Sequence, residues 1–429
     1  MRSELRNSAV SLLLVLLACA PAAEAPVQDP PADTPLVTTP TSPSIVDSTT
    51  PPYDWFTLDR VPSPGPVPFV VDDQALPLDP DLVDPEFDSL GHQVVTVEFV
   101  EPDRGDVWVA AMDPATGEII PGDGRGERIG DRAASVTRSG NGPEWLYSER
   151  GPEVLYAYVM GPSPRIVRAW QDAGGWEGEF VPGSEGLLAP LGSLDPDDPE
   201  PRLVSRQEDA LRAWWRFIDD PEDQLLVDAD MPRSPRWVPG THDAVFAAPD
   251  GELLQTFVLD ADTGTIEQLT DEPTGVGTVY MWFSPSLGET IFFGTLLNED
   301  LDAIRMAVFQ QIDDEWQIVK TIEPPVDFPF IGSPEYFVYE GRSYIFYSTC
   351  SEPLRSLAVR YEEPGIGGAC GDSRIWITGA EPDNHVHRMI SAETEMTRND
   401  PEAYVTDQGA WVYYTDAPGG GLHRCATGL

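Results

Sequence analysis

From about residue 92 to the end, the chain alternates apolar and polar positions in short runs that Gly, Pro, Asn and Asp separate. Alternation with a period of two is typical of strands that bury one face, and the separating residues favour turns. Residues 206–218 have a helical alternative, but 211–217 lie between strand-like runs and fit a strand better. The pattern therefore predicts an all-β fold.

The predicted strands recur in groups of four. In the clearest group, an aromatic strand opens after a turn with proline at 235–238, and further strands follow at 244–247, 256–260 and 266–270. Other groups open near residues 145, 188, 282, 336 and 404. Repetition of four short antiparallel strands about every fifty residues is what a β-propeller requires, because each blade buries both faces against its neighbours.

The openings predict six blades, with seven as the alternative if the N-terminal strands form a blade of their own. The last group has only two or three strands before the chain ends, and the strand-like segments 94–100 and 107–112 lack a matching opening. We therefore expect the two ends of the chain to complete one blade together, which removes free sheet edges. The propeller is assigned to residues 92–429.

Two segments resemble a known family of repeats. Residues 259–270 read Leu-Asp-Ala-Asp-Thr-Gly-Thr-Ile-Glu-Gln-Leu-Thr, and residues 113–117 read Asp-Pro-Ala-Thr-Gly. Both resemble the end of a TolB-type propeller repeat, in which a strand, an Asp-x-x-x-Gly turn and a closing Leu-Thr recur. Residues 283–285 resemble its Trp-Ser-Pro-Asp-Gly turn, although 286–288 replace the Asp-Gly. The resemblance implies a propeller and leaves function open, since propellers include binding proteins, hydrolases and lyases.

The N-terminal segment has the layout of an export signal. A basic start precedes an apolar run at 9–18 that is too short to span a membrane. Residues 16–19, Leu-Leu-Ala-Cys, resemble the lipobox of bacterial lipoproteins. The resemblance implies that residues 1–18 are removed and that lipids are attached to Cys19. An ordinary cleaved signal with a chance cysteine is the alternative.

The segment after the signal is predicted to be a tether. Residues 19–52 are rich in Pro, Thr, Ser and Asp and contain few large apolar side chains, so folding cannot offset their ordering entropy. Proline keeps such a segment extended, and it could hold the folded body up to about 100 Å from the lipid. Because Ala20 and not aspartate follows the cysteine, the resemblance implies an outer-membrane lipoprotein. Residues 53–91 are interpreted as an N-terminal extension that packs on the propeller.

The charge is strongly acidic, with 73 Asp and Glu against 26 Lys and Arg and a formal net charge of −47. Such a surface repels phosphate backbones and excludes nucleic acid as a partner. The same excess is also typical of adaptation for solubility or salt. We expect a monomer that contacts the membrane through its lipid and binds an envelope protein or glycan.

Three cysteines remain once Cys19 is assigned to lipid, and outside the cytoplasm a pair of them can oxidise. Cys350 ends one predicted strand and Cys370 precedes another, so we predict a Cys350–Cys370 disulfide that leaves Cys425 free. His385 and His387 would share one face of a strand, a spacing that metals use. Both follow a polar run that fits a hairpin, so no metal site is predicted there.

Pro-Glu pairs open three of the predicted groups, at Glu144, Glu335 and Glu402. Because opening strands line the channel of a propeller, we expect the three carboxylates to meet at one mouth. There they could bind Ca²⁺ or another cation, receive a basic partner, or act as acid and base. A role limited to capping or solvating a turn is the alternative. No other cofactor is expected.

Residues 333–347 resemble the general-acid segment of five-bladed glycoside hydrolases, which implies Glu335 as a catalytic acid. Asp54 is then the nearest candidate for its partner. The blade count argues against this family, and the chain has no Gly-x-Ser-x-Gly, His-Glu-x-x-His or phosphate-loop motif. We therefore predict a binding or interaction module without catalytic residues, with a secreted propeller glycoside hydrolase as the alternative.

Replacing Cys19 with Ser should release the protein from the membrane fraction, because the variant has no thiol to acylate. Fractionation of cells that express wild type or C19S, with mass spectrometry of the N-terminal peptide, measures this. Membrane retention of C19S, together with a wild-type peptide that carries no acyl mass, would contradict lipidation.

Overall fold

The computed structural model describes residues 71–78, 82–88, 90–101, 104–134, 141–159, 163–195, 201–207, 213–217, 224–226, 233–300, 302–353, 372–417 and 421–429. The chain divides into two compact units, Met1–Asp47 and Ser48–Leu429, and every described residue belongs to the second. The predicted signal, Cys19 and the tether lie outside the described residues, as do Asp54 and Cys370. In the described part, no helix is long and apolar enough to cross a membrane.

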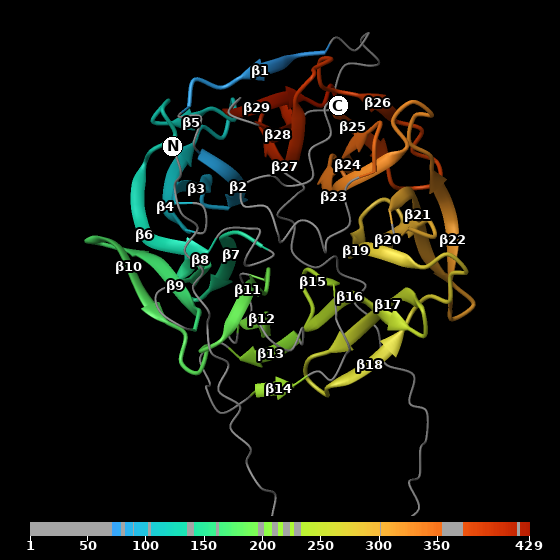
Figure 1. Ribbon diagram of the computed structural model, residues 1–429, viewed down its shortest axis with the longest axis horizontal. Helices are drawn as coiled ribbons and strands as arrows, with labels where there is room; N and C mark the ends of the chain where they lie inside the picture. The colour runs from blue at the N-terminus through green and yellow to red at the C-terminus, as the bar shows by residue number, and fades with distance from the viewer. Residues whose placement is uncertain are drawn as a thin grey trace, which may run out of the picture. The chain divides into compact units, whose positions relative to one another are not determined.

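All regular elements in the described ranges are β-strands, and they form antiparallel groups of four (Figure 1). Group 1 contains β2 (Leu82–Asp88), β3 (Gln93–Glu101), β4 (Arg104–Met112) and β6 (Glu127–Ala134), with the short β5 (Ile119–Ile120) beside β4. Group 2 contains β7 (Glu144–Ser148), β8 (Gly151–Tyr158), β9 (Arg165–Asp172) and β10 (Gly175–Phe180). One residue pair, Ala133 with Tyr158, joins groups 1 and 2 into a single sheet.

The next four groups are simple meanders. Group 3 contains β11 (Leu187–Gly192), β12 (Arg202–Gln207), β13 (Ala213–Phe217) and β14 (Gln224–Leu226). Group 4 contains β15 (Arg233–Trp237), β16 (Asp243–Asp250), β17 (Leu253–Asp260) and β18 (Thr265–Gln268). Group 5 contains β19 (Val276–Ser284), β20 (Glu289–Leu297), β21 (Ala303–Ile312) and β22 (Glu315–Ile322). Group 6 contains β23 (Phe330–Tyr339), β24 (Arg342–Cys350), β25 (Arg374–Gly379) and β26 (His387–Met389).

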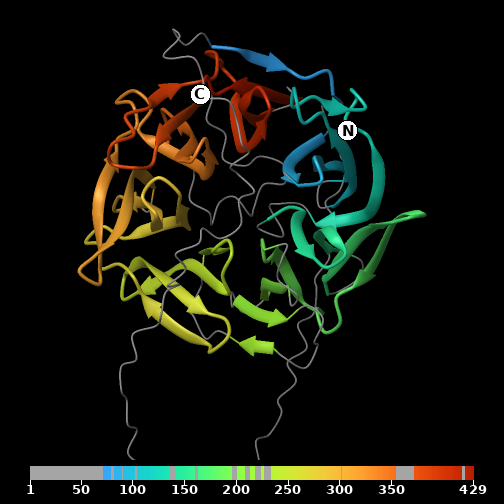
Figure 2. The ribbon, with the colours of Figure 1, turned by 180° about the vertical axis from the view of Figure 1, so that it is seen from behind.

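Group 7 combines the two ends of the described chain. It contains β27 (Thr397–Thr406), β28 (Gly409–Ala417), β29 (Gly421–Ala426) and, as its outer strand, β1 (Asp73–Ala75) (Figures 1 and 2). Each group contacts the next, and β2 of group 1 contacts β27 of group 7, so the described strands close into a ring. Because both faces of each sheet are covered, buried aromatic and aliphatic side chains fill the space between neighbouring groups.

The structure agrees with one sequence expectation about the strands and corrects two others. Residues 213–217 form a strand, as the pattern favoured. The described strands form seven groups and not the six that the opening strands predicted, because β2 opens a group of its own. Its apolar residues are interrupted by Asp84, Pro85 and Glu86, which hid the strand pattern. The boundary at residue 92 is therefore wrong, since β1 and β2 already belong to the ring.

The expectation that the two ends complete one group is confirmed, but through a different segment. β1 supplies the missing strand, and Asp73 pairs with Cys425 on β29. The segments 94–100 and 107–112, which were expected there, lie in group 1 with β2. Cys425 is buried and free, and Cys350 is disulfide-bonded. The Cys350–Cys370 pairing stays a prediction, because Cys370 lies outside the described residues.

A buried ion pair fastens the closing strand. The Asp73 carboxylate accepts hydrogen bonds from Arg398 Nη2 at 2.9 Å, from the Ala392 N–H at 2.8 Å and from the Tyr414 hydroxyl. The Arg398 and Asp73 side chains are only 3% and 6% exposed. Burial by itself would raise the pKa of Asp73, but its partners, His423 among them, lower this pKa to about 2. β1 is therefore held by one charged side chain as well as by its short ladder.

Replacing Asp73 with Asn should lower the free energy of unfolding by about 3 to 5 kcal/mol, because Arg398 then lacks one buried counter-charge. Loosening of β1 should also expose Cys425, which lies opposite residue 73. Denaturant titration and the rate of thiol labelling at Cys425 measure both effects. Asp72→Asn is the matched control, since Asp72 is an exposed neighbour. Equal labelling rates in the two variants would show that Asp73 does not hold the strand.

Candidate functional site

The inner strands of the ring carry a recurrent β-bulge. The register shifts at this place in six of them, between Val83 and Glu86, Leu188 and Leu191, Arg233 and Arg236, Val276 and Val279, Gly332 and Glu335, and Asn399 and Glu402. In four of these bulges the residue before a proline has a positive φ, namely Asp84, Ala189, Ser333 and Asp400. Such backbone is strained for residues other than glycine, and bulges commonly redirect a side chain at a functional site.

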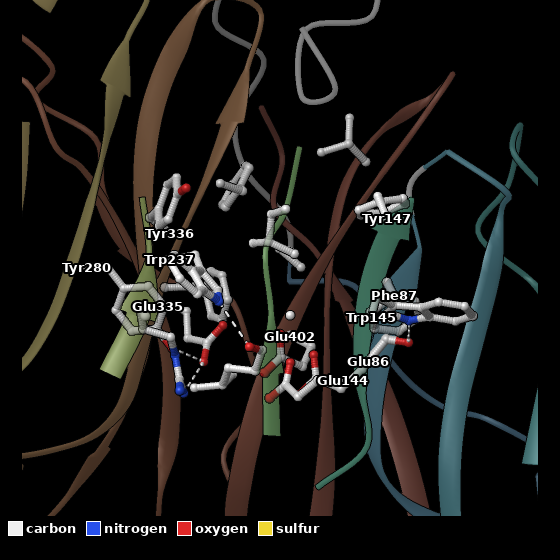
Figure 3. Close-up of a pocket in the computed structure, with 18 residues that line it drawn as sticks. Glu86, Phe87, Glu144, Trp145, Tyr147, Trp237, Tyr280, Glu335, Tyr336 and Glu402 are labelled. Carbon is white, nitrogen blue, oxygen red and sulfur yellow. Dashed lines mark hydrogen bonds and ion pairs between the residues drawn. The ribbon is translucent and has the colours of Figure 1, made fainter. Parts of the chain in front are cut away.

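Side chains at or just after these six bulges, together with Glu144 at the start of β7, meet at a cavity of about 160 Å³ (Figure 3). Each of the seven groups contributes one of them, namely Glu86, Glu144, Leu191, Arg236, Tyr280, Glu335 and Glu402. The structure therefore brings together Glu144, Glu335 and Glu402, as the repeat alignment predicted. It also adds Glu86, which the sequence reasoning missed. The signal was present, because Asp84-Pro85-Glu86 repeats the pattern of Asp400-Pro401-Glu402.

The cavity has an acidic side and a second, less acidic side. Strands β23, β27, β2 and β7 follow one another around the ring and each contributes a glutamate. We call Glu335, Glu402, Glu86 and Glu144 the acidic arc. The remaining three groups contribute Leu191, Arg236 and Tyr280. Four carboxyl groups thus face a single guanidinium among the described residues that line the cavity.

Arg236 is engaged at one end of the arc. Its Nε donates to the Tyr280 hydroxyl at 2.9 Å, and its Nη2 lies 4.0 Å from Glu335 Oε1. The Tyr280 hydroxyl in turn donates to Glu335. The Arg236 and Glu335 side chains are 23% and 25% exposed, so both border open space in the cavity. At the other end, the Asn141 amide donates to Glu144.

The pKa values of all four carboxyl groups of the acidic arc are raised. Burial raises the pKa of Glu144 to about 8, although Arg236 opposes this shift. Burial, followed by repulsion from neighbouring carboxylates, raises the pKa of Glu86 and Glu402 well above the usual range. Burial also raises the pKa of Glu335, against the effect of Arg236 and Tyr280. The charge of Glu335 is, after burial, the largest influence that raises the pKa of Glu402.

A second pair of carboxyl groups adjoins the arc. Burial, followed by the charge of Asp400, raises the pKa of Asp84 well above the usual range. Asp84 is only 5% exposed, and its Oδ2 has no hydrogen-bond partner within the described ranges. A Cβ at Gly142 would lie 1.4 Å from this oxygen, so only glycine fits beside it. The Asp84 carboxyl is therefore inserted against the segment that leads into Glu144.

Aromatic side chains fix the backbone of the cavity wall. Trp145 Nε1 donates to the Glu86 carbonyl oxygen at 2.9 Å, and Trp237 Nε1 donates to the Leu191 carbonyl oxygen at 2.9 Å (Figure 3). Each bond links one inner strand to the inner strand of the preceding group. Both indoles line the cavity together with Tyr280 and Tyr336. The wall therefore combines carboxyl groups with aromatic surface, which is the chemistry that recognises organic cations.

The histidine pair lies elsewhere. His387 on β26 forms a 3.0 Å hydrogen bond with the Tyr347 hydroxyl, and His385 precedes that strand. Neither residue lines the cavity. Across the described ranges, no group of three or more His, Cys, Asp or Glu side chains is arranged to hold a metal ion. This finding includes the acidic arc.

No protein-family model and no curated protein matches the sequence. Solved structures match through their fold. An oligogalacturonate lyase from Vibrio parahaemolyticus has a TM-score of 0.51 at 9% identity, over 83% of this chain and 93% of its own. The WD40 domain of Toxoplasma gondii coronin has a TM-score of 0.50 at 9% identity, over 84% and 87%.

The chain is a β-propeller. Similarity at this level of identity shows the fold alone, and the two matched propellers differ in kind, since one is named a lyase and the other a WD40 domain. The narrower resemblance to TolB-type repeats stays a prediction. The function has to be inferred from the cavity.

When no binding partner is added, the free energy of unfolding should fall as pH rises from about 4.5 to about 8. Over this range the folded protein keeps a proton on Glu144 that the unfolded chain has lost, because the pKa changes from 4.5 to about 8 on folding. Glu144→Gln should flatten this dependence. Denaturant titrations between about pH 5 and pH 9 measure it, with the exposed Glu177→Gln as control for the loss of one charge. Parallel profiles for both variants would contradict the assignment.

Proposed function

We propose that the protein is an envelope-anchored binding module whose propeller receives a cationic side chain, Lys or Arg, of a protein partner. The observation that supports this most is the acidic arc, in which four glutamates on consecutive inner strands line one cavity. A buried group of carboxyls needs positive charge to ionise, and Arg236 is the one cation among the described residues that line the cavity. An incoming cation would supply that charge.

The size and lining of the cavity favour an organic cation over a metal ion or a large ligand. Its volume of about 160 Å³ is smaller than the roughly 300–1,000 Å³ of pockets for drug-sized molecules. The wall includes Trp145, Trp237 and Tyr336, whose ring faces attract ammonium and guanidinium groups. The carboxyl groups are not arranged as a metal site in the described part of the protein. The end of one basic side chain suits these features.

The charge of the whole chain supports the same partner class. A net charge of −47 attracts basic surfaces over long range and repels nucleic acid. We propose that the protein acts as a monomer, held at the outer membrane through lipid on Cys19. An envelope glycan is a weaker candidate, because the acidic arc is better suited to charge recognition than to neutral sugars.

The glycoside hydrolase alternative has less support. A retaining enzyme needs two carboxyl groups about 5 to 5.5 Å apart, and an inverting enzyme needs a wider gap. Asp54, the partner inferred from sequence, lies outside the described residues.

The test uses a short Gly/Ser peptide with one central Arg, and the same peptide with citrulline, which has the same shape without the charge. Wild type should bind the Arg peptide and not the citrulline peptide. The triple variant E144Q/E335Q/E402Q should bind it at least tenfold more weakly, because three of the four carboxyls of the arc are gone. Calorimetry measures the affinities, and circular dichroism checks that the variant is folded.

A matched triple variant distinguishes the effect of the cavity carboxyls from the effect of the overall negative charge. E177Q/E252Q/E315Q removes the same charge from three exposed side chains. It should bind the Arg peptide as wild type does. Equal loss of affinity in both triple variants, or equal binding of the citrulline peptide, would refute the cavity as the binding site.

A further inference from the structure

We infer that Tyr280 is a positioning residue: its hydroxyl holds Arg236 against the cavity wall, and Arg236, when it is not held there, competes with the partner's cation for the acidic arc. The inference rests on the proposed function and adds the regulation of the same site. It follows from the contacts of the arginine, from the place of the tyrosine hydroxyl between two partners, and from the fixed position of the tyrosine ring.

Arg236 shows that the cavity already binds one guanidinium group. The Arg236 side chain is 23% exposed, and its Cζ lies 5.2 Å from the centre of the Tyr280 ring. Its Nε donates to the Tyr280 hydroxyl at 2.9 Å, and its Nη2 lies 4.0 Å from Glu335 Oε1. An aromatic ring, a hydroxyl acceptor and a carboxylate are groups that a guanidinium from a partner would also use. Arg236 and the partner's cation therefore need the same kinds of contact.

The Tyr280 hydroxyl lies between Arg236 and Glu335. It accepts a hydrogen bond from Arg236 Nε and donates one to the Glu335 carboxylate (Figure 3). A direct hydrogen bond between a guanidinium and a carboxylate is about 2.7 to 2.9 Å long. The 4.0 Å between Arg236 Nη2 and Glu335 Oε1 is too long for such a bond. Arg236 is therefore linked to Glu335 through the hydroxyl.

Tyr280 has a fixed position, whereas Arg236 has a flexible side chain. Tyr280 is only 8% exposed, and its ring stacks on Phe293 with the ring centres 5.5 Å apart. Besides its bond to Tyr280, Arg236 donates through Nη1 to the carbonyl oxygen of its neighbour Pro235 at 3.2 Å. An arginine side chain has considerable rotamer freedom. When these contacts change, the arginine can move and the tyrosine ring stays in place.

Loss of the hydroxyl should move Arg236 toward the arc. Tyr280→Phe removes the acceptor of Arg236 Nε and the donor to Glu335, and both side chains are only partly exposed. A direct, charge-assisted bond between Arg236 and Glu335 would satisfy both groups. Glu335 is then neutralised by the chain itself and attracts an incoming cation less. The net charge of the protein does not change, so the long-range attraction of the partner stays the same.

Calorimetry on the full chain with the single-Arg peptide tests this. Y280F should bind the peptide about tenfold more weakly than wild type, the effect of one charge-assisted hydrogen bond. R236Q should bind it about tenfold more tightly, because the competing guanidinium is gone. The double variant Y280F/R236Q should bind as R236Q does, since Tyr280 acts through Arg236. Circular dichroism and denaturant titration check that each variant is folded.

Y404F is the matched control, because it removes a buried tyrosine hydroxyl outside the cavity, one that lies 2.9 Å from His92 Nδ1. It should bind the peptide as wild type does. Nuclear magnetic resonance of the arginine Nε–H groups provides a signal that a general loss of stability would not give. The Arg236 signal, assigned by its absence in R236Q, should shift in Y280F and stay unchanged in Y404F.

The outcomes distinguish this inference from the proposed function. If wild type binds the peptide but neither Y280F nor R236Q changes the affinity, the inference is overturned and the binding site remains. If neither wild type nor R236Q binds the peptide, the proposed function is overturned together with the inference. An equal loss of affinity from Tyr280→Phe in the wild-type and R236Q backgrounds would show that Tyr280 contacts the partner directly, which contradicts its action through Arg236.

Discussion

Closure of the ring through Asp73 and Arg398 is the interaction on which the rest of the structure depends. Each sheet buries both faces against its neighbours, so no group of four strands is complete unless the circle is closed. The seventh group receives its outer strand from the beginning of the described chain. A three-residue strand offers few backbone hydrogen bonds, and the buried carboxylate adds the charged contact that the ladder lacks.

The closed ring in turn makes the cavity possible. Carboxyl groups repel one another once ionised, and a flexible chain would move them apart. Here the bulges, the prolines and the indole hydrogen bonds fix seven inner strands at a common centre. Because these strands cannot move apart, repulsion between the carboxylates raises the pKa values of Glu86 and Glu402. The same architecture places one arginine at the edge of the arc, where Arg236 lowers the pKa of both Glu335 and Glu144 against the effect of burial.

The sequence predicts the all-β class, the repetition of four strands and three of the four cavity glutamates, because period-two patterning and Pro-Glu pairs are local signals. It does not predict the group that β2 opens, since Asp84, Pro85 and Glu86 break the apolar alternation there. It also hides the role of Arg236, which lies in the clearest repeat at the position equivalent to the glutamates. Alignment by the bulge, and not by the aromatic strand, places Glu86, Arg236, Glu335 and Glu402 at equivalent positions. The pairing of Asp73 with Arg398 joins residues too far apart for any local pattern to show.

Placement of the closing strand also determines when the fold can form. β1 lies near the start of the described residues, and its partner β29 (Gly421–Ala426) follows more than three hundred residues later. Six groups are contiguous in sequence and can assemble as they become available, but the seventh cannot acquire its outer strand until both ends are present. Contacts of such long sequence separation slow folding, because the loop must close before the contact stabilises it. Until that step, β29 presents an unpaired edge, so the polypeptide should require protection from edge-to-edge association during folding.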